Sequence, residues 1–351
     1  MKTLYASKVD INQEKEIVDY MNTFVRCNSY NMKDFKWQYN RNKKLGEFYF
    51  LKDNEIFASQ GMIPTTLLNN EKEITSVKSE SSFLATDYRG KGYFEQIYFD
   101  ALNDCVEKNI DLAWGFTALE NVWKKKLGFE CYDIFHECRI ILSPKQIFKN
   151  SKSNYGKKIL QYIINTPYYL RLKRILNPSS YVIKSIEKEN KGKYLTEIYK
   201  EWTKQHPKLI SIKLDFKYLE WRILNNPRCS YETLIINDEE NINIGFVICN
   251  VTKFDIYIVE LIVIQDQNIQ KCLNVIINKY LNCNHHQSIS YLGNIKNPYN
   301  QIIISLMSKL GAKTKELKDM KFVLRQLSKN KLNFEVSHFT LNGLWTEGFK
   351  I

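Results

Sequence analysis

The stretch from residue 74 to residue 102 constrains the fold most, because its pattern changes from strand to turn to helix. β-Branched and aromatic residues predict a strand over 74–85, and apolar residues three and four apart predict a helix from Tyr93 onwards. The turn between them is Arg89-Gly90-Lys91-Gly92. A helix start exposes backbone N–H groups and the positive end of the helix dipole, and the two basic residues add formal charge. The stretch therefore predicts an anion site that suits a pyrophosphate.

Length and composition limit the classes of protein that remain. A chain of 351 residues with 44% hydrophobic residues can form two cores and is not an extended disordered chain. No apolar run is long enough to span a bilayer, and the first residues lack the apolar core of a signal peptide. The eight cysteines occur singly, without a Cys-x-x-Cys pair. We therefore expect a cytoplasmic protein with reduced thiols, no metal site and no stable membrane insertion.

The net charge of +13 raises the question of a polyanionic partner. Nucleic acid is one answer, but no recognition motif or strongly basic tail supports it, so we expect no nucleic-acid partner. Most of the charge is expected to be a solvated lysine surface, and the rest suits a basic cleft for an anionic cofactor and acceptor.

The order of predicted elements is repeated along the chain. Over roughly the first 145 residues it is strand, helices, three antiparallel strands, helix, strand, helix and strand, the last strand lying within 129–142. The second half again has helices, then three strands between residues 233 and 264, and then helix, strand, helix and a last strand at 321–324. The loop 265–268 of this second copy has no glycine and no basic residue. We expect the second copy to have lost the anion site.

The turn and two further motifs resemble the GNAT acyltransferase superfamily. Arg89-Gly90-Lys91-Gly92-Tyr93, after a strand and opening a helix, is similar to its coenzyme A loop, although Phe94 replaces a usual small residue. Gln60-Gly61 followed by Pro64 resembles a mid-sheet strand of sugar- and amine-acylating members. Lys125-Lys126-Leu127-Gly128-Phe129 resembles the segment that closes the superfamily's fourth helix. The resemblance implies a mixed α+β (α/β) fold of two GNAT-like domains, each a twisted, mostly antiparallel sheet flanked by helices, with the second degenerate.

The predicted domains follow from this repeat. They are a catalytic GNAT domain over 1–145, a helical bridge over 146–190, a degenerate GNAT-like domain over 191–328 and a C-terminal segment over 329–351 that packs at the domain junction. The basic, aromatic helix over 155–175 can be interpreted as a membrane-surface helix, but we expect its apolar stripe to pack between the domains. Trp221-Arg222, with Pro227 and Tyr231 beyond, resembles a signature of tandem-GNAT proteins linked to surface-polysaccharide synthesis.

The resemblance also implies which residues bind acetyl-coenzyme A or another acyl-coenzyme A. A strand edge would pair with the pantetheine arm, the turn would hold the pyrophosphate, and an asparagine would touch the pantetheine. The residues assigned in this way are Leu84, Ala85, Thr86, Arg89, Gly90, Lys91, Gly92, Tyr93, Phe94 and Asn121. A longer acyl group, or one carried by an acyl carrier protein, is left open.

Catalysis in the superfamily is direct attack of an amine on the thioester, with a base and an acid. We expect Glu80 to be the base, with a solvent-facing strand carboxylate as the equal alternative, and Glu120 as second choice. Lys124 stands where the superfamily has a tyrosine acid, so it is either the acid or an exposed side chain. The terminal carboxylate of Ile351 is a further candidate base. Substrate contacts are expected from Gln60 and Arg222.

The resulting prediction is an N-acyltransferase whose acceptor is a primary amine, favoured as that of a nucleotide-linked amino sugar. Acylation of a peptide, an antibiotic amine or a lipid-linked precursor is the alternative within enzymes. A non-catalytic coenzyme-binding or scaffold protein is the alternative from another class, and the missing tyrosine at Lys124 favours it. The sequence leaves a monomer and a homodimer open.

Overall fold

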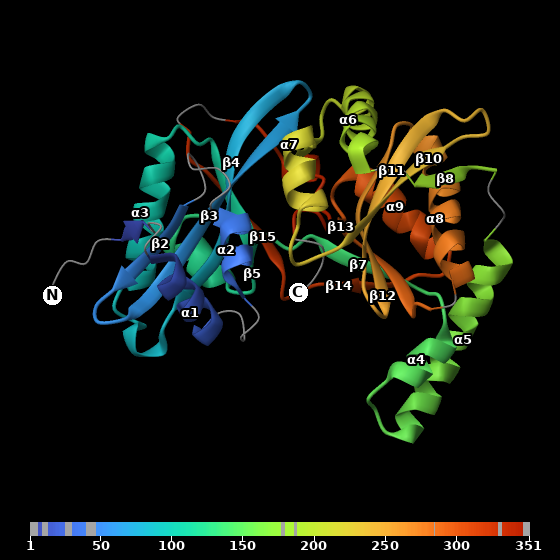
Figure 1. Ribbon diagram of the computed structural model, residues 1–351, viewed down its shortest axis with the longest axis horizontal. Coiled ribbons are helices and arrows are strands. Elements are labelled where there is room, and N and C mark those ends of the chain that lie inside the picture. Colours follow the sequence, from blue (N-terminus) through green and yellow to red (C-terminus); the bar gives the residue numbers. More distant parts are fainter. Residues whose placement is uncertain are drawn as a thin grey trace.

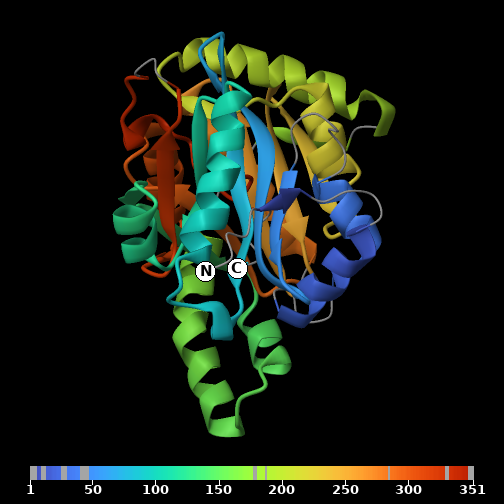
Figure 2. The ribbon, with the colours of Figure 1, turned by 90° about the vertical axis from the view of Figure 1, so that its left-hand side faces the viewer.

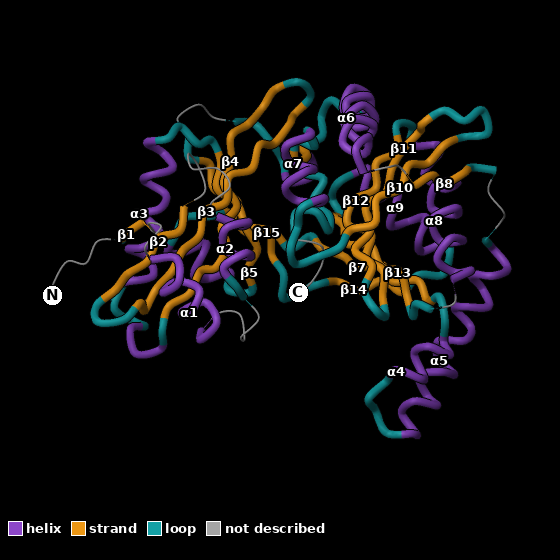
Figure 3. The backbone as a smooth tube through the Cα atoms, viewed as in Figure 1, coloured by secondary structure: helices purple, strands orange, loops and turns teal. Residues whose placement is uncertain are grey.

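Two mixed sheets, each flanked by helices, lie side by side in the protein (Figure 1). The computed structural model describes residues 6–8, 13–24, 30–39, 47–176, 180–185, 188–283, 285–328 and 332–346. Figure 3 shows the strands of both sheets between their covering helices. Most neighbouring strands are antiparallel, with one parallel pair in each sheet. The predicted mixed α+β class is confirmed.

The first sheet contains the strand that leads into the predicted anion site. Its strands, in sheet order, are β1 (Ser7–Lys8), β2 (Glu47–Lys52), β3 (Ile56–Asn69), β4 (Lys72–Leu84), β5 (Leu112–Thr117), β15 (Lys321–Gln326) and β6 (Glu130–Tyr132), with β9 (Ile210–Ile212) paired to β3. Helix α3 (Tyr93–Glu107) joins β4 to the parallel strand β5. Its buried face, which includes Ile97, Ala101 and Leu102, packs on the sheet, as its apolar spacing predicts. The other helices of this half are α1 (Glu14–Phe24) and α2 (Met32–Tyr39).

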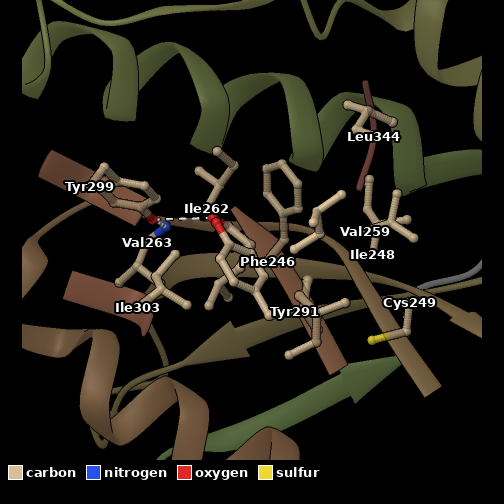
Figure 4. Close-up of a cluster of buried hydrophobic side chains, with 14 of the residues drawn as sticks. Phe246, Ile248, Cys249, Val259, Ile262, Val263, Tyr291, Tyr299, Ile303 and Leu344 are labelled. Atoms are coloured by element: carbon tan, nitrogen blue, oxygen red, sulfur yellow. Dashed lines mark hydrogen bonds between the residues drawn. The ribbon is translucent and has the colours of Figure 1, made fainter. Parts of the chain in front are cut away.

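The second sheet has a continuous apolar core. Its strands, in sheet order, are β14 (Lys313–Glu316), β7 (Phe135–Ile141), β13 (Ser288–Asn294), β12 (Asp255–Val263), β11 (Asn243–Val251), β10 (Tyr231–Asn237) and β8 (Val182–Ser185). Its helices are α6 (Lys188–Gln205), α7 (Phe216–Leu219), α8 (Ile269–Cys283) and α9 (Pro298–Lys309). Figure 4 shows part of this core around Phe246 and Tyr291, where the Tyr299 hydroxyl accepts a 2.9 Å hydrogen bond from the Val263 N–H. Strands this apolar are expected where both faces of a sheet are covered.

The two sheets exchange strands. Strand β7 pairs with β13 and β14 of the second sheet, whereas β15 lies between β5 and β6 of the first. The prediction that 129–142 completes the first sheet is therefore right only for β6, and the strand predicted at 321–324 belongs to the first sheet, not the second. Aromatic pairing accounts for the place of β15, because Phe322 lies opposite Phe116 and beside Trp114. The domain boundaries at 145, 190 and 328 stay predictions. The two sheets do not divide the chain at these residues, because β7 belongs to the second sheet and β15 to the first.

The bridge between the halves is a helical hairpin of α4 (Pro144–Asn150) and α5 (Tyr155–Ile175), which projects from the body of the protein (Figures 1 and 2). Of the α5 side chains, only Asn165 and Leu172 are buried. The expectation that α5 packs between the domains is therefore wrong. Its apolar residues have helical spacing, but they recur around the whole circumference, so the spacing does not select a buried face.

Candidate active site

A splay between two strands forms the centre of the candidate site. Strands β4 and β5 pair only over 76–78 and 112–114, and beyond these residues both strands continue without pairing to one another. A bulge bends β4 at the same place, since its register with β3 shifts between Ser59 and Gly61 and Ser81 has φ 53°. The backbone edges of two strands therefore face a common space, where extended ligands can pair with them.

This space is a cavity of about 1290 Å³ whose walls come from both halves of the chain. The first half supplies β4, the turn that begins α3, the end of β5 and the π-helical turn η3 (Val122–Lys126). The second half supplies the loop before β10, the loop before β15 and the end of the C-terminal segment. The second-half residues in the wall are Asn226, Arg228, Cys229, Asp319, Met320 and Thr346.

One end of the cavity has the features of an anion site. Gly90 and Gly92 have φ of 77° and 81°, and a Cβ atom built on either glycine meets nothing within 4 Å. Gly92 is the N-cap of α3, and no side chain caps this helix start, so backbone N–H groups and the helix dipole face the cavity. Arg89 also lines this end, with its Nε donating to the Leu84 carbonyl at 3.3 Å. The open space over two glycines fits a pyrophosphate that lies close to the backbone.

Lys126 adds a cation at this end that the sequence prediction missed. It reaches from η3 to the first turn of α3, where its Nζ lies 2.6 Å from Glu95 Oε1, and both residues line the cavity. The hydrogen bond from Lys126 lowers the pKa of the Glu95 carboxyl. The Lys-Leu-Gly-Phe segment was the signal for this residue, because it places a lysine two residues before the glycine that follows the helix.

The structure brings only part of the predicted coenzyme set to the cavity wall. Leu84, Arg89, Gly90, Gly92 and Phe94 line it, whereas the remaining members do not. Successive side chains around a tight turn point in different directions, and those that miss the wall have other contacts. Tyr93 packs on the Phe57 ring, and the Lys91 ammonium lies 5.4 Å from the centroid of the Tyr88 ring. The Ala85 N–H donates to the Phe57 carbonyl, and Thr86 begins the 3₁₀ turn η2 (Thr86–Tyr88). Asn121 is exposed.

Glu80 lies on the wall at the splay, with its side chain 16% exposed, and forms an ion pair with Lys78. Lys78 is two residues earlier on β4, on the same face, and its ammonium lies 5.9 Å from the ring centroids of both Trp114 and Phe116. A buried ammonium between two aromatic rings is restricted to few positions, and its charge compensates the carboxylate. The ion pair therefore fixes the position of the Glu80 carboxylate beside the strand edges.

The other predicted catalytic and substrate residues do not line this cavity. The Glu120 Oε2 lies 3.4 Å from the Lys321 Nζ, at the edge formed by β15 and β6. Lys124 is exposed, because η3 turns Trp123 inward instead. Gln60 has no exposed surface and bonds Ser79 and Ser82. Arg222 is buried over the Trp37 ring and borders a void of about 10 Å³. Ile351 lies outside the described residues.

The part of the cavity wall formed by Trp37 and the loop before β10 was not predicted. Trp37 lines it, held by reciprocal hydrogen bonds in which its indole N–H donates to the Trp221 carbonyl and the Trp221 indole donates back, at 2.9 and 2.8 Å. The Asn226 Oδ1 accepts hydrogen bonds from the backbone N–H groups of Arg228 and Cys229 and so stabilises the loop that carries them. Trp37 lies on α2, whereas Arg228 and Cys229 lie in the loop before β10, far away in the sequence. They line one cavity only because the two halves of the chain pack against each other.

The second sheet has the same splay, but the chain's own C-terminal segment occupies it. Strands β12 and β13 are parallel over 255–258 and 288–291 and then diverge. The Leu344 N–H donates to the Val259 carbonyl and the Asn294 N–H donates to the Leu341 carbonyl, both within the splay. A Cβ on Gly343 would lie 3.0 Å from the Val259 Cα. The second copy therefore has no open edge at the place that corresponds to the cavity of the first.

A buried carboxyl holds this segment and makes one prediction about pH. Burial raises the pKa of Glu260, on β12, to about 8, and its Oε1 accepts hydrogen bonds from Asn342 Nδ2 and the Leu261 N–H. Because the folded pKa lies above the ordinary 4.5, stability from this group is complete below that value and is lost as the pH rises towards the folded pKa. We expect the wild-type unfolding midpoint to fall more steeply between about pH 5 and pH 8 than that of Glu260→Gln. Thermal melts at several pH values test this, and parallel curves for both proteins would contradict it.

No family model and no curated protein matches the sequence. Solved structures do match. A conserved Enterococcus faecalis protein, described as a "Probable N-Acyltransferase", has a TM-score of 0.65 at 13% identity, over 93% of this chain and 73% of its own. A GCN5-related N-acetyltransferase from Anabaena variabilis has 0.64 at 11% identity, with the same coverage.

A third similar structure carries a ligand. Saccharomyces cerevisiae N-myristoyltransferase with bound myristoyl-CoA has a TM-score of 0.56 at 11% identity, over 92% of this chain and 83% of its own. Together these matches show that the chain has the fold of the GCN5-related N-acetyltransferases, consistent with two such domains. Within the described part of the chain, no group of three metal-ligating side chains is found. None of the described helices is long and apolar enough to cross a membrane.

Proposed function

We propose that the protein is an acyl-coenzyme A-dependent N-acyltransferase with one working site, at the splay of β4 and β5. One observation carries the proposal: a single cavity joins an uncapped helix start over two open glycines to a partly buried, ion-paired carboxylate. An anion cradle and a proton acceptor are the two things that transfer of an acyl group from a phosphate-bearing donor to an amine requires. The coenzyme thioester would supply the activated acyl group.

In this proposal each group of residues has a separate task. The first turn of α3, Arg89 and Lys126 bind the pyrophosphate, and the free edge of β4 holds the donor beside the splay. Glu80 accepts the proton that the attacking amine loses, and Lys78 positions Glu80. Backbone N–H groups at the splay stabilise the negative charge that develops on the carbonyl oxygen. Since Lys124 is exposed, the leaving thiolate takes its proton from water.

The acceptor we propose is the primary amine of a nucleotide-linked amino sugar. Arg228 and Trp37, which line the part of the cavity that we assign to the acceptor, support this choice, because a guanidinium suits a phosphate and an indole face suits a ring. We also propose that the protein is related to the tandem-GNAT proteins of surface-polysaccharide synthesis. A peptide, an antibiotic amine or a lipid-linked precursor is the alternative acceptor.

The test combines calorimetry with turnover. We expect saturable binding of acetyl-CoA or a longer acyl-CoA, and amine-dependent release of coenzyme A, followed by chromatography, with a uridine-diphosphate amino sugar in preference to a peptide or an aminoglycoside. Failure of every acyl-CoA to bind would overturn the proposal. Binding without turnover on any amine would instead favour the non-catalytic coenzyme-binding protein.

A further inference from the structure

The α4–α5 hairpin, residues 143–176, differs in charge from the rest of the protein. It contains no aspartate or glutamate, whereas the whole chain has 38. Its basic residues are Lys145, Lys149, Lys152, Lys157, Lys158, Arg171, Lys173 and Arg174. A helix that is simply solvated normally mixes charges of both signs. This segment therefore presents a surface of one sign, which suits an anionic partner.

The hairpin also exposes large apolar side chains. In α5, Tyr155 is 71% exposed, Ile163 59% and Leu160 56%. The other exposed apolar side chains of this helix are Ile159, Tyr162, Ile164, Leu170 and Ile175. Single exposed apolar residues are ordinary, but a run of them along one helix marks an interaction surface.

Among the described residues, the side-chain contacts between α5 and the body involve the C-terminal half of the helix. The Lys313 Nζ donates a 2.6 Å hydrogen bond to the Asn165 Oδ1 and lies 4.5 Å from the centroid of the Tyr168 ring. Leu172 is buried. The N-terminal half packs instead on α4, where the Phe148 ring lies 6.0 Å from Tyr155 and 6.2 Å from Tyr162. Figures 1 and 2 show this end of the hairpin standing away from both sheets. The free end is therefore both apolar and positively charged.

We propose that the α4–α5 hairpin docks the protein on the surface of an anionic lipid bilayer. Lysine and arginine attract the acidic headgroups, while the aliphatic and tyrosine side chains enter the boundary between headgroups and acyl chains. Tyrosine suits this boundary because its ring is apolar and its hydroxyl polar. Charge complementarity favours lipid over a neutral protein groove. The proposal is independent of the acyltransferase activity.

The test is sedimentation of the full chain with vesicles. We expect binding to phosphatidylserine–phosphatidylcholine vesicles, weak binding to phosphatidylcholine alone, and weakening at high salt. The variants Lys149→Glu with Lys157→Glu, and Leu160→Ser with Ile163→Ser, should each reduce the partition coefficient about tenfold or more. All four side chains are exposed, so folding should be unaffected, which thermal melts verify.

Matched controls change the same residue types elsewhere. Lys15→Glu with Lys200→Glu alters net charge equally, and Val106→Ser with Ile242→Ser removes two exposed apolar side chains, 47% and 55% exposed. The controls should retain wild-type partitioning within about twofold, because charges beyond a Debye length of the bilayer are screened. Absence of binding to anionic vesicles, or equal losses in hairpin and control variants, would overturn the proposal. So would a dimer in light scattering that only the hairpin variants dissociate, since the partner would then be a second copy.

Discussion

Replacement of Glu80 by glutamine is expected to lower kcat by about 10²- to 10⁴-fold, the usual contribution of a general base. The amide keeps the size of the side chain and its place on the cavity wall, but it does not accept the proton of an attacking amine. Acyl-CoA affinity should stay within about twofold, because Glu80 lies at the splay and not at the glycine turn. Steady-state kinetics and calorimetry on the same preparation measure both quantities.

Two features of Glu80→Gln need control. The change leaves the buried ammonium of Lys78 without its carboxylate, so part of any loss in kcat could come from local unfolding. Thermal melts detect this, and Glu73→Gln, which changes an exposed carboxylate on the same strand, is the matched variant. Full activity in a folded Glu80→Gln protein would remove Glu80 as the base.

Arg89→Glu combined with Gly92→Asp is expected to weaken acyl-CoA binding about 100-fold or more. The first change replaces a cation at the cavity mouth by an anion. The second puts a carboxylate at the helix start, where it takes the N–H groups that we assign to the pyrophosphate, and imposes a side chain at φ 81°. Calorimetric titration with acetyl-CoA gives the dissociation constants.

The control for this prediction lies in the same turn. Lys91 carries the same charge as Arg89 but does not line the cavity, so Lys91→Glu should weaken binding far less. If Lys91→Glu and Arg89→Glu weakened binding equally, the general charge of the turn would matter and not the geometry of the cradle. If the double variant bound as tightly as wild type, the donor would lie elsewhere.

Local structure around the cradle was predictable from sequence. The strand predicted over 74–85 is β4, which ends at Leu84, and the helix predicted from Tyr93 is α3, which begins there. Alternation, glycine and helical spacing act over a few residues, and here they agree. The missing glycine and basic residues of the loop 265–268 predicted that the second copy has lost its anion site, but no local rule predicted that the C-terminal segment occupies the second splay.

What escaped prediction depends on contacts between distant residues. A strand pattern such as 321–326 predicts a strand but does not say which sheet it joins, because any free edge offers the same backbone pairing. The helical spacing of α5 likewise gives no information on whether a partner covers it. At the site, Lys124 and Trp123 are neighbours in sequence, and only the π-helical turn decides that the indole faces inward.

The exchange of β7 and β15 has a consequence for how the chain is made. The first sheet needs β15 between β5 and β6, so it stays incomplete until the ribosome has released residue 326. Until then the edge of β5 is open, and an open strand edge is a template for pairing with other chains. Long-range closure of this kind also slows folding. While the chain is being made, the N-terminal half thus exposes a strand edge that can pair with other chains.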